Sequence, residues 1–165
     1  MTVFFNALYL SRYLLCSLVC LSFVSTLSAQ SFNEVIKLTD AQRENNDEMG
    51  TAVAISGNYA IVGIPNDDDS PNGPDLPNAG SAIIYERNAN GNWVEVQKLV
   101  AGDRENEDLF GSAVSIDGNY AIVGSPQDDE DPNGNSFISN SGAAYIFERQ
   151  SNGSWTQVQK ITSVT

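Results

Sequence analysis

Two loops of the chain carry oxygen-bearing side chains at the spacing that calcium sites use. One reads Asp-x-Asp-x-Asn-Gly over 129–134, the opening of an EF-hand-like loop, and 68–73 reads as a weaker copy, Asp-x-Ser-x-Asn-Gly. Side chains at every second position bring their oxygens to one side, and the glycine permits a sharp turn. We therefore predict bound Ca²⁺ as a cofactor. The predicted metal ligands are Asp129, Asp131, Asn133, Asp68, Ser70 and Asn72.

Two features of these loops oppose calcium. An EF-hand supplies a bidentate glutamate at its twelfth position, where this chain has Asn140 and Ala79. A proline at 132 and another at 71 stiffen the loops. The alternative is that these acids form only a solvated rim that keeps the protein soluble.

The composition excludes several kinds of chemistry. The chain has 165 residues, 21 acidic and 8 basic side chains, a net charge of −13 and no histidine. Without histidine there is no Ser–His–Asp triad, no Cys–His pair and no His-ligated zinc. Nucleic acid is disfavoured as a partner because phosphate binding needs clustered lysine and arginine. Catalysis would have to rely on paired carboxylates.

The first 29 residues are predicted to be a secretory signal peptide. They contain no acid and one base, Arg12, followed by an apolar run over 13–27 and a small residue at Ala29, the predicted cleavage position. An N-terminal membrane anchor is the alternative. Both cysteines, Cys16 and Cys20, lie in this segment, so the mature chain would have no disulfide. Losing Arg12 leaves 7 bases against 21 acids, a net charge of −14.

The remaining sequence repeats itself at a period of about sixty residues. The heptapeptide Gly-Asn-Tyr-Ala-Ile-Val-Gly at 57–63 returns at 118–124, an offset of 61. Trp93 matches Trp155 at an offset of 62, so one residue is inserted between them. Such self-similarity is typical of repeat architectures. A lysine followed by leucine or isoleucine recurs at 37, 98 and 160.

Each repeat is predicted to form four short antiparallel strands with Gly-containing hairpin turns. The inner strands are apolar or small on both faces, so we expect them to be covered on both sides, whereas the last strand alternates and suits an outer edge. This is the pattern of a propeller blade. The predicted strands are 50–55, 59–64, 80–87 and 92–99 in the first blade, and 111–116, 120–125, 142–149 and 154–161 in the second.

The predicted fold is an all-β propeller fragment: two four-stranded antiparallel blades plus a lone N-terminal outer strand. The blades span about 50–99 and 111–161, and the lone strand spans 30–38, of which 32–38 aligns with 93–99. Two blades cannot close a ring, and each blade needs neighbours to bury its faces. We expect the chain to be the N-terminal part of a longer propeller. Assembly of several short chains into a ring is the alternative.

The motifs that flank the inner strands resemble those of a known family. Phe110-Gly111, followed by Gly124-Ser125-Pro126, is similar to the Phe-Gly…Gly-Ala-Pro motif of FG-GAP repeats. The first repeat has Met49-Gly50 and Gly63-Ile64-Pro65. FG-GAP repeats build the N-terminal propeller of integrin α subunits and many secreted bacterial surface proteins, which this chain resembles more. The resemblance covers nearly all of 30–165 and implies a β-propeller; it is weak for function.

One part of the family pattern does not carry over. Integrin-type repeats hold calcium in an Asp-x-Asp/Asn-x-Asp-Gly loop between the first two strands of a blade. Here that connection is only 56–58 or 117–119, which has too few carboxylates to fill six to eight oxygen positions. The resemblance therefore implies no calcium at this connection.

Blade topology predicts that most acids converge on one face. The connections between blades, and those between the second and third strands of each blade, emerge together there. Such a face concentrates cations and repels anionic partners. The inter-blade acids are Asp40, Glu44, Asp47, Glu48, Asp103, Glu105, Glu107 and Asp108. Besides the metal ligands above, the predicted binding face comprises Asp67, Asp69, Asp75, Asp128 and Glu130.

Three functional classes compete. The preferred one is a non-catalytic binding or adhesion module, secreted or on the cell surface, whose partner is an extracellular protein or carbohydrate. An extracellular carbohydrate-active enzyme using paired carboxylates is the second. A purely structural propeller segment without a ligand of its own is the third. A membrane association would arise only through export or through an anchor outside this chain.

Overall fold

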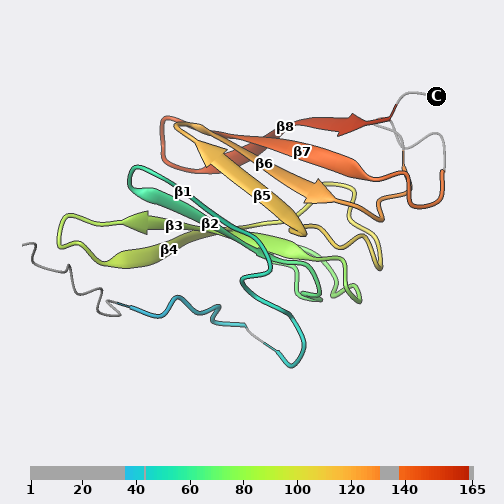
Figure 1. The fold of residues 1–165 in the computed structure, drawn as a ribbon, viewed down its shortest axis with the longest axis horizontal. Coiled ribbons are helices and arrows are strands. Elements are labelled where there is room, and N and C mark those ends of the chain that lie inside the picture. Colours follow the sequence, from blue (N-terminus) through green and yellow to red (C-terminus); the bar gives the residue numbers. More distant parts are fainter. Residues whose placement is uncertain (1–35, 43, 131–137, 164–165) are drawn as a thin grey trace, which may run out of the picture. The chain divides into compact units, whose positions relative to one another are not determined.

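A computed structural model describes residues 36–42, 44–130 and 138–163, and these residues form two antiparallel β-sheets (Figure 1). The strand orders are β1-β2-β3-β4 and β5-β6-β7-β8, so each sheet is a simple meander. We call these sheets blade 1 and blade 2. Within the described residues, no helix is long and apolar enough to cross a membrane. The strands are β1 (Val53–Ser56), β2 (Tyr59–Ile64), β3 (Ser81–Arg87), β4 (Trp93–Leu99), β5 (Ala113–Asp117), β6 (Tyr120–Ser125), β7 (Ala143–Arg149) and β8 (Trp155–Thr162).

The eight strands predicted from the sequence are confirmed, and β2 and β6 have the predicted bounds. The largest differences are at β1 and β5, which begin three and two residues later than predicted. The cause is a turn ahead of each strand, where Gly50 and Gly111 adopt φ of 98° and 99°. That left-handed conformation is open to glycine and ends the preceding connection with a turn before pairing begins.

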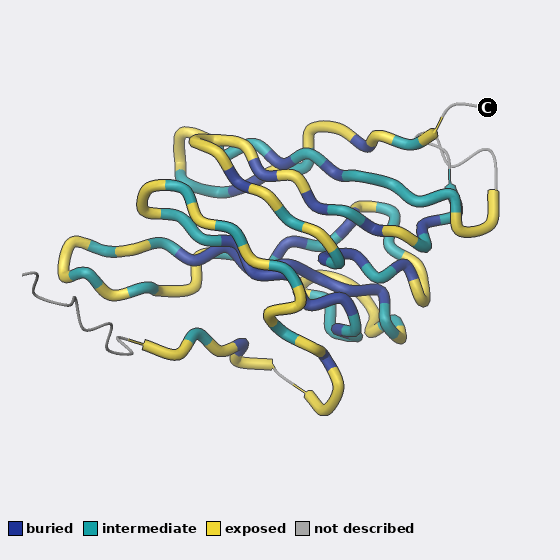
Figure 2. The backbone as a smooth tube through the Cα atoms, viewed as in Figure 1, coloured by how far each residue is buried: buried dark blue, intermediate teal, exposed yellow. Residues whose placement is uncertain are grey.

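The blades pack through opposite faces of their sheets. We call the face of blade 1 that carries Ile61, Ala82 and Ile84 its back face, and the face of blade 2 that carries Val123 and Phe147 its front face. These side chains form one buried core between the sheets. Figure 2 shows this burial along the strands where the sheets meet. The opposite faces, which are the front face of blade 1 and the back face of blade 2, are named by the same matching of repeat positions.

The expectation that the inner strands are covered on both sides is wrong for β1 and for the back face of blade 2, whereas β2 buries Ile61 on one face and Val62 on the other. On the front face of blade 1, Val53 and Ile55 are 67% and 66% exposed. On the back face of blade 2, Tyr120 and Ile122 are 53% and 40% exposed. The physical reason is that each blade meets the other sheet on one face only, while Leu38 and Met49 cover only the Val62 side of β2. The apolar pattern on both faces of a blade therefore predicts a neighbouring sheet on each side, whereas the described residues place a sheet against one side only.

The N-terminal part of the chain lies mostly outside the described residues. This applies to the predicted signal peptide and to 30–35 of the predicted lone strand. Of the rest of that strand, 36–38 forms no strand. Leu38 and Met49 instead pack against a small cluster on the front face of blade 1 that includes Val62 and Tyr85.

Candidate functional site

The long connections gather at one end of the blades, and the hairpin turns lie at the other (Figure 1). We call the end formed by the described parts of 39–52, 65–80, 100–112 and 126–142 the acidic loop face. Arg104 ties two of these connections together, because its guanidinium donates to the carbonyl oxygens of Pro74 at 3.2 Å and Asp68 at 3.3 Å. The predicted convergence of these loops is therefore confirmed. Arg104 does this through main-chain oxygens rather than through an ion pair with an acid.

A buried lysine with two carboxylates anchors this face in blade 1. The Nζ of Lys98 on β4 lies 3.1 Å from Asp40 Oδ2 and 2.6 Å from Asp67 Oδ2. All three side chains are buried. The Ser81 hydroxyl at the start of β3 donates a further hydrogen bond to Asp67. Buried charges persist when they are paired and hydrogen-bonded in this way.

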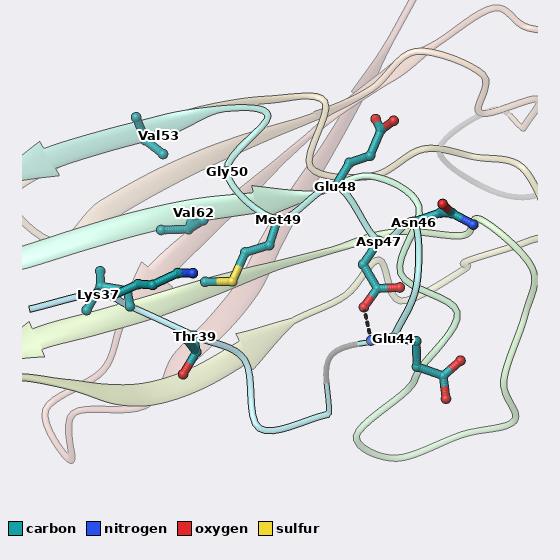
Figure 3. Close-up of a pocket in the computed structure, with 11 residues that line it drawn as sticks. Lys37, Thr39, Glu44, Asn46, Asp47, Glu48, Met49, Gly50, Val53 and Val62 are labelled. Carbon is teal, nitrogen blue, oxygen red and sulfur yellow. Dashed lines mark hydrogen bonds between the residues drawn. The ribbon is translucent and has the colours of Figure 1, made fainter.

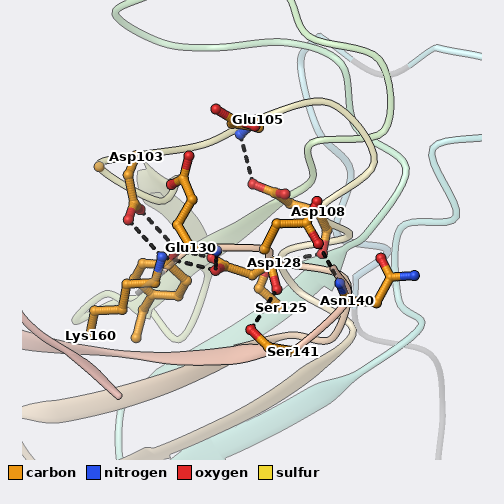
Figure 4. A network of polar contacts seen from close by, with 12 residues as sticks. Asp103, Glu105, Asp108, Ser125, Asp128, Glu130, Asn140, Ser141 and Lys160 are labelled. Atoms are coloured by element: carbon orange, nitrogen blue, oxygen red, sulfur yellow. Dashed lines mark hydrogen bonds and ion pairs between the residues drawn. The ribbon is translucent and has the colours of Figure 1, made fainter. Parts of the chain in front are cut away.

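Blade 2 repeats the arrangement with a different hydroxyl (Figure 4). Lys160 Nζ on β8 lies 2.8 Å from Asp103 Oδ2 and 2.9 Å from Asp128 Oδ1. The Tyr145 hydroxyl on β7 contacts Asp128 and lies 2.8 Å from Asp103 Oδ1, so its single proton serves one carboxylate at a time. Burial lowers the pKa of Lys160, but its hydrogen bonds and the charges of Asp103 and Asp128 outweigh burial and raise the pKa.

A second pair of buried aspartates shapes the inter-blade connections. Asp108 Oδ2 accepts a hydrogen bond from the Glu105 N–H at 2.7 Å, and Asp47 accepts the equivalent bond from Glu44. Burial raises the pKa of Asp108 to about 6, with the N–H bond from Glu105 opposing the rise and the charge of Asp128 adding to it. Each carboxylate bonds an N–H three residues earlier in its own connection, and so it fixes the backbone of the acidic loop face.

A cleft of about 640 Å³ opens between the two blades on the acidic loop face. Its side chains include Ser70 and Asn72 from blade 1, and Arg104, Glu105 and Glu130 from the blade 2 side. Partial burial and a hydrogen bond to Glu105 raise the pKa of Glu130 to about 7. The cleft offers carboxylate, amide and hydroxyl groups to a ligand.

The first residue of each predicted calcium loop has a structural contact. Asp68 Oδ1 accepts a hydrogen bond from the Asn78 N–H at 2.7 Å, and Asp129 Oδ1 accepts one from the Asn140 N–H. Asn78 and Asn140 both adopt φ of 50°, so the aspartate secures a left-handed residue at the far end of the loop.

The calcium prediction itself stays open. The Ser70 hydroxyl accepts a 3.4 Å bond from the Asn72 N–H, a local turn contact. Asp131 and Asn133 lie outside the described residues. In 36–42, 44–130 and 138–163, no three Asp or Glu side chains are grouped as a metal would require.

The predicted binding-face residues separate into two sets. Asp67 and Asp128 are buried in the lysine networks, so their carboxylates are engaged inside the protein. Asp69 and Glu130 are half-buried, and Asp75 is exposed. Burial raises the pKa of Asp69, and the neighbouring Asp67 charge adds to the effect. The accessible acids of this face therefore come from the rim of the loops.

The sequence reasoning missed the residues that organise the site. Lys98, Lys160, Ser81 and Tyr145 were not among the predicted functional residues, although each contacts a predicted acid. The sequence did point to the lysines, because a lysine recurs at the same place in two outer strands whose other polar residues were predicted to face solvent. The two hydroxyls left no such signal, since Ser81 and Tyr145 are not at matching repeat positions.

Comparison with known families agrees with the repeat seen in the fold. A family model described as FG-GAP repeat matches residues 32–85 and 93–147. The second match begins with β4 and ends in β7, so one family unit joins the outer strand of one blade to three strands of the next. No curated protein matches the chain.

Proposed function

Because this chain belongs to the FG-GAP repeat family, we propose that it is a non-catalytic, β-propeller-like binding or adhesion module that engages its partner through the acidic loop face. The partner we propose is an extracellular protein or carbohydrate. The observation that carries the proposal is the cleft between the blades. Its polar rim includes Glu105 and Glu130, and it is backed by buried lysine–carboxylate networks.

Rigid backing favours a binding role for this face. The Lys98 and Lys160 networks fix the inner acids, and Arg104 links the two connections that border the cleft. A preformed surface loses little conformational entropy when a ligand binds. Concave sites with a few convergent polar groups are also the usual form of ligand-binding sites.

Export to the cell surface or medium is part of this proposal. It rests on the sequence of residues 1–29, with its apolar run and Ala29 before the predicted cleavage position. Expression of the full chain in an exporting bacterial host should yield protein whose first residue is Gln30, as measured by mass spectrometry. Protein that keeps Met1 and stays in the membrane fraction would support the anchor alternative instead.

Binding can be tested on arrays of immobilised glycans and extracellular matrix proteins. We expect the full chain to bind a subset of these probes and the double variant Glu105→Gln, Glu130→Gln to lose that binding. The double variant Asp117→Asn, Glu95→Gln is a matched control, because it removes two acids outside the cleft. Equal binding by both double variants, or no binding to either probe class, would contradict the proposal.

The enzymatic alternative receives less support from the cleft. Glycosidases that use two carboxyl groups hold them about 5 Å or more apart. Of the three acids that line the cleft, Asp103 is paired with the buried Lys160 at 2.8 Å, and Glu105 and Glu130 are near enough for their charges to interact. A bell-shaped pH–rate profile on polysaccharides that disappears in Glu130→Gln would nevertheless establish catalysis.

A further inference from the structure

The contact between the blades includes a backbone segment that docks into a groove. Residues 107–110 run alongside 77–80 in parallel, with a bridge between Gly80 and Phe110. The N–H groups of Glu107, Leu109 and Phe110 donate to the carbonyls of 77–79 at 2.9, 3.1 and 3.0 Å. A Cβ atom at Gly63, Gly80 or Gly111 would collide with the opposing backbone. The groove is therefore shaped for a close approach of main chain to main chain.

Blade 2 presents the same groove on its back face, where it is open. This cavity of about 460 Å³ is lined by residues that include Gly124, Gly142, Ala144 and Ile161. The first three match Gly63, Gly80 and Ala82 of the filled groove. The carbonyls of 139–141 match those of 77–79, and among the described residues no backbone N–H donates to them.

Side chains around the open groove are exposed where their repeat partners are buried. Ile61 is fully buried between the blades, whereas the matching Ile122 is 40% exposed. Leu99 is 1% exposed and the matching Ile161 is 44% exposed. The back face of blade 2 is thus an apolar surface built to the pattern of a surface that the molecule itself covers.

The front face of blade 1 carries the complementary half of the contact. It includes residues 46–50, which match 107–111 of the docked segment and have the same backbone conformation. Asn46, Glu48 and Gly50 have φ of 74°, 57° and 98°, and the matching residues in 107–111 have φ of 67°, 55° and 99°. Figure 3 shows this segment beside Val53 and Val62. Among the described residues, the N–H groups of Asn46, Glu48 and Met49 donate no hydrogen bond.

We propose that two copies of this chain associate head to tail, with residues 46–50 and the front face of blade 1 of one copy docked on the back face of blade 2 of the other. The intramolecular contact supplies the template. Because the two surfaces differ, the contact is heterologous, and repeated association closes a ring or continues as a filament.

The polar contacts of the template are also available at the two open faces. Within the chain, Arg149 Nη1 donates to the Tyr59 hydroxyl at 2.8 Å, and its guanidinium lies 4.7 Å from the Tyr59 ring centroid. The matching residues on the outward faces are Arg87 and Tyr120. Arg87 is exposed, and its guanidinium donates a 3.5 Å bond to the Gly91 carbonyl.

A second polar pair is repeated in the same way. The amide of Gln97 bonds both main-chain groups of Trp155, each at 2.8 Å. Its repeat match, Gln159, is exposed on blade 2, and Trp93 is the match of Trp155 on blade 1. The two open faces therefore carry chemically matched partners rather than two unrelated apolar patches.

Docking requires one rearrangement. Residues 36–38 match the end of β8 in the repeat, and Leu38 packs where Ile161 of the other copy would lie. Because 36–38 forms no strand, no sheet hydrogen bonds oppose its displacement by β8.

The experiment is sedimentation velocity on the full chain over a series of concentrations. We expect the wild-type mass to rise above that of one chain as concentration increases. Ile122→Lys blocks the back face of blade 2, and Ile55→Lys blocks the front face of blade 1. Each variant alone should sediment as a monomer. A mixture of the two should form a one-to-one dimer that grows no further, because each dimer retains only blocked faces.

Asn90→Lys is the matched control, since it adds the same charge at the exposed tip of the β3–β4 hairpin and should associate as the wild type does. Both blocked positions are exposed, and urea unfolding checks that each variant is folded. Gln159→Ala and Arg87→Ala test the two faces without introducing a charge, and each should weaken association. Wild-type protein that stays monomeric at every concentration would overturn the proposal, as would a mixture of blocked variants that forms no dimer.

Discussion

At the residue scale, two buried lysines form ion pairs with aspartates of the acidic loop face and so hold its loops in place. Lys98 and Lys160 each pair with two aspartates at the base of the acidic loop face. The hydroxyl that completes each network comes from Ser81 in one blade and Tyr145 in the other. The chemistry is therefore maintained although the residue that supplies the hydroxyl has changed its type and position.

Replacing Lys160 with methionine should destabilise the protein strongly. The change leaves Asp128, which is 2% exposed, without its cation, and an uncompensated buried charge costs about 3–5 kcal/mol. Urea unfolding monitored by tryptophan fluorescence measures the loss. The double variant Lys160→Met, Asp128→Asn should recover part of it. A single variant as stable as the wild type would show that the ion pair contributes nothing.

The raised pKa of Asp108 predicts a pH dependence of stability. Its folded-state pKa of about 6 lies above the ordinary value of 3.8, so between these values the folded state binds more protons than the unfolded state. This contribution is complete below about pH 4 and is lost as the pH rises through about 6. We expect Asp108→Asn to flatten the decline in the free energy of unfolding over that window. Parallel curves for variant and wild type would contradict the assignment.

At the element scale, the repeating unit of sequence and the folded blade are out of phase. The family unit 93–147 starts with β4, which pairs with β3 in blade 1, and continues into the inner strands of blade 2. These parts are linked by the connection 100–112, which contains the residues 107–111 that dock on blade 1. One unit therefore spans two blades, so neither blade is built from a single unit.

Two glycines at matching positions test the docking segment. Gly50→Ala places alanine at φ of 98° with no atom near its Cβ, so we expect a loss of about 1–2 kcal/mol. Gly111→Ala carries the same strain at φ of 99° and also drives its Cβ into the Ser81 carbonyl. Urea unfolding of dilute protein should show a clearly larger loss for Gly111→Ala. Equal losses would mean that the backbone contact yields without cost.

At the scale of the whole molecule, the excess of acids is concentrated at one end. The buried networks neutralise some of them, while the rim acids remain accessible around the cleft. A negative surface of this kind raises the local concentration of cations. This is the physical basis on which calcium remains a proposal for the 129–134 loop.

Thermal unfolding in calcium and in excess EDTA tests that proposal. A ligand that binds only the folded state raises the unfolding temperature, so we expect a higher midpoint in calcium. Replacing Asp129 and Asp131 with asparagine should abolish the difference, while Asp117→Asn at the other end should preserve it. Identical melts of the wild type in both conditions would reduce the acidic loops to a solvated rim.

Local sequence patterns were enough to predict the repeat, the eight strands, their hairpin turns and the end of the blades where the acids gather. These features follow from local patterns, because strand propensity, turn glycines and the repeat period are all properties of short segments. The bounds of β2 and β6 could be predicted because Gly-Asn turns precede both strands.

Tertiary contacts determine which acids are accessible and which faces are covered. Asp67 and Asp75 belong to the same loop, yet one is buried against Lys98 and the other is exposed. Ile61 and Ile122 occupy the same place in identical heptapeptides and differ only in what lies against them. Burial and ion pairing depend on neighbours brought from distant parts of the chain, so identical local sequences reach different environments.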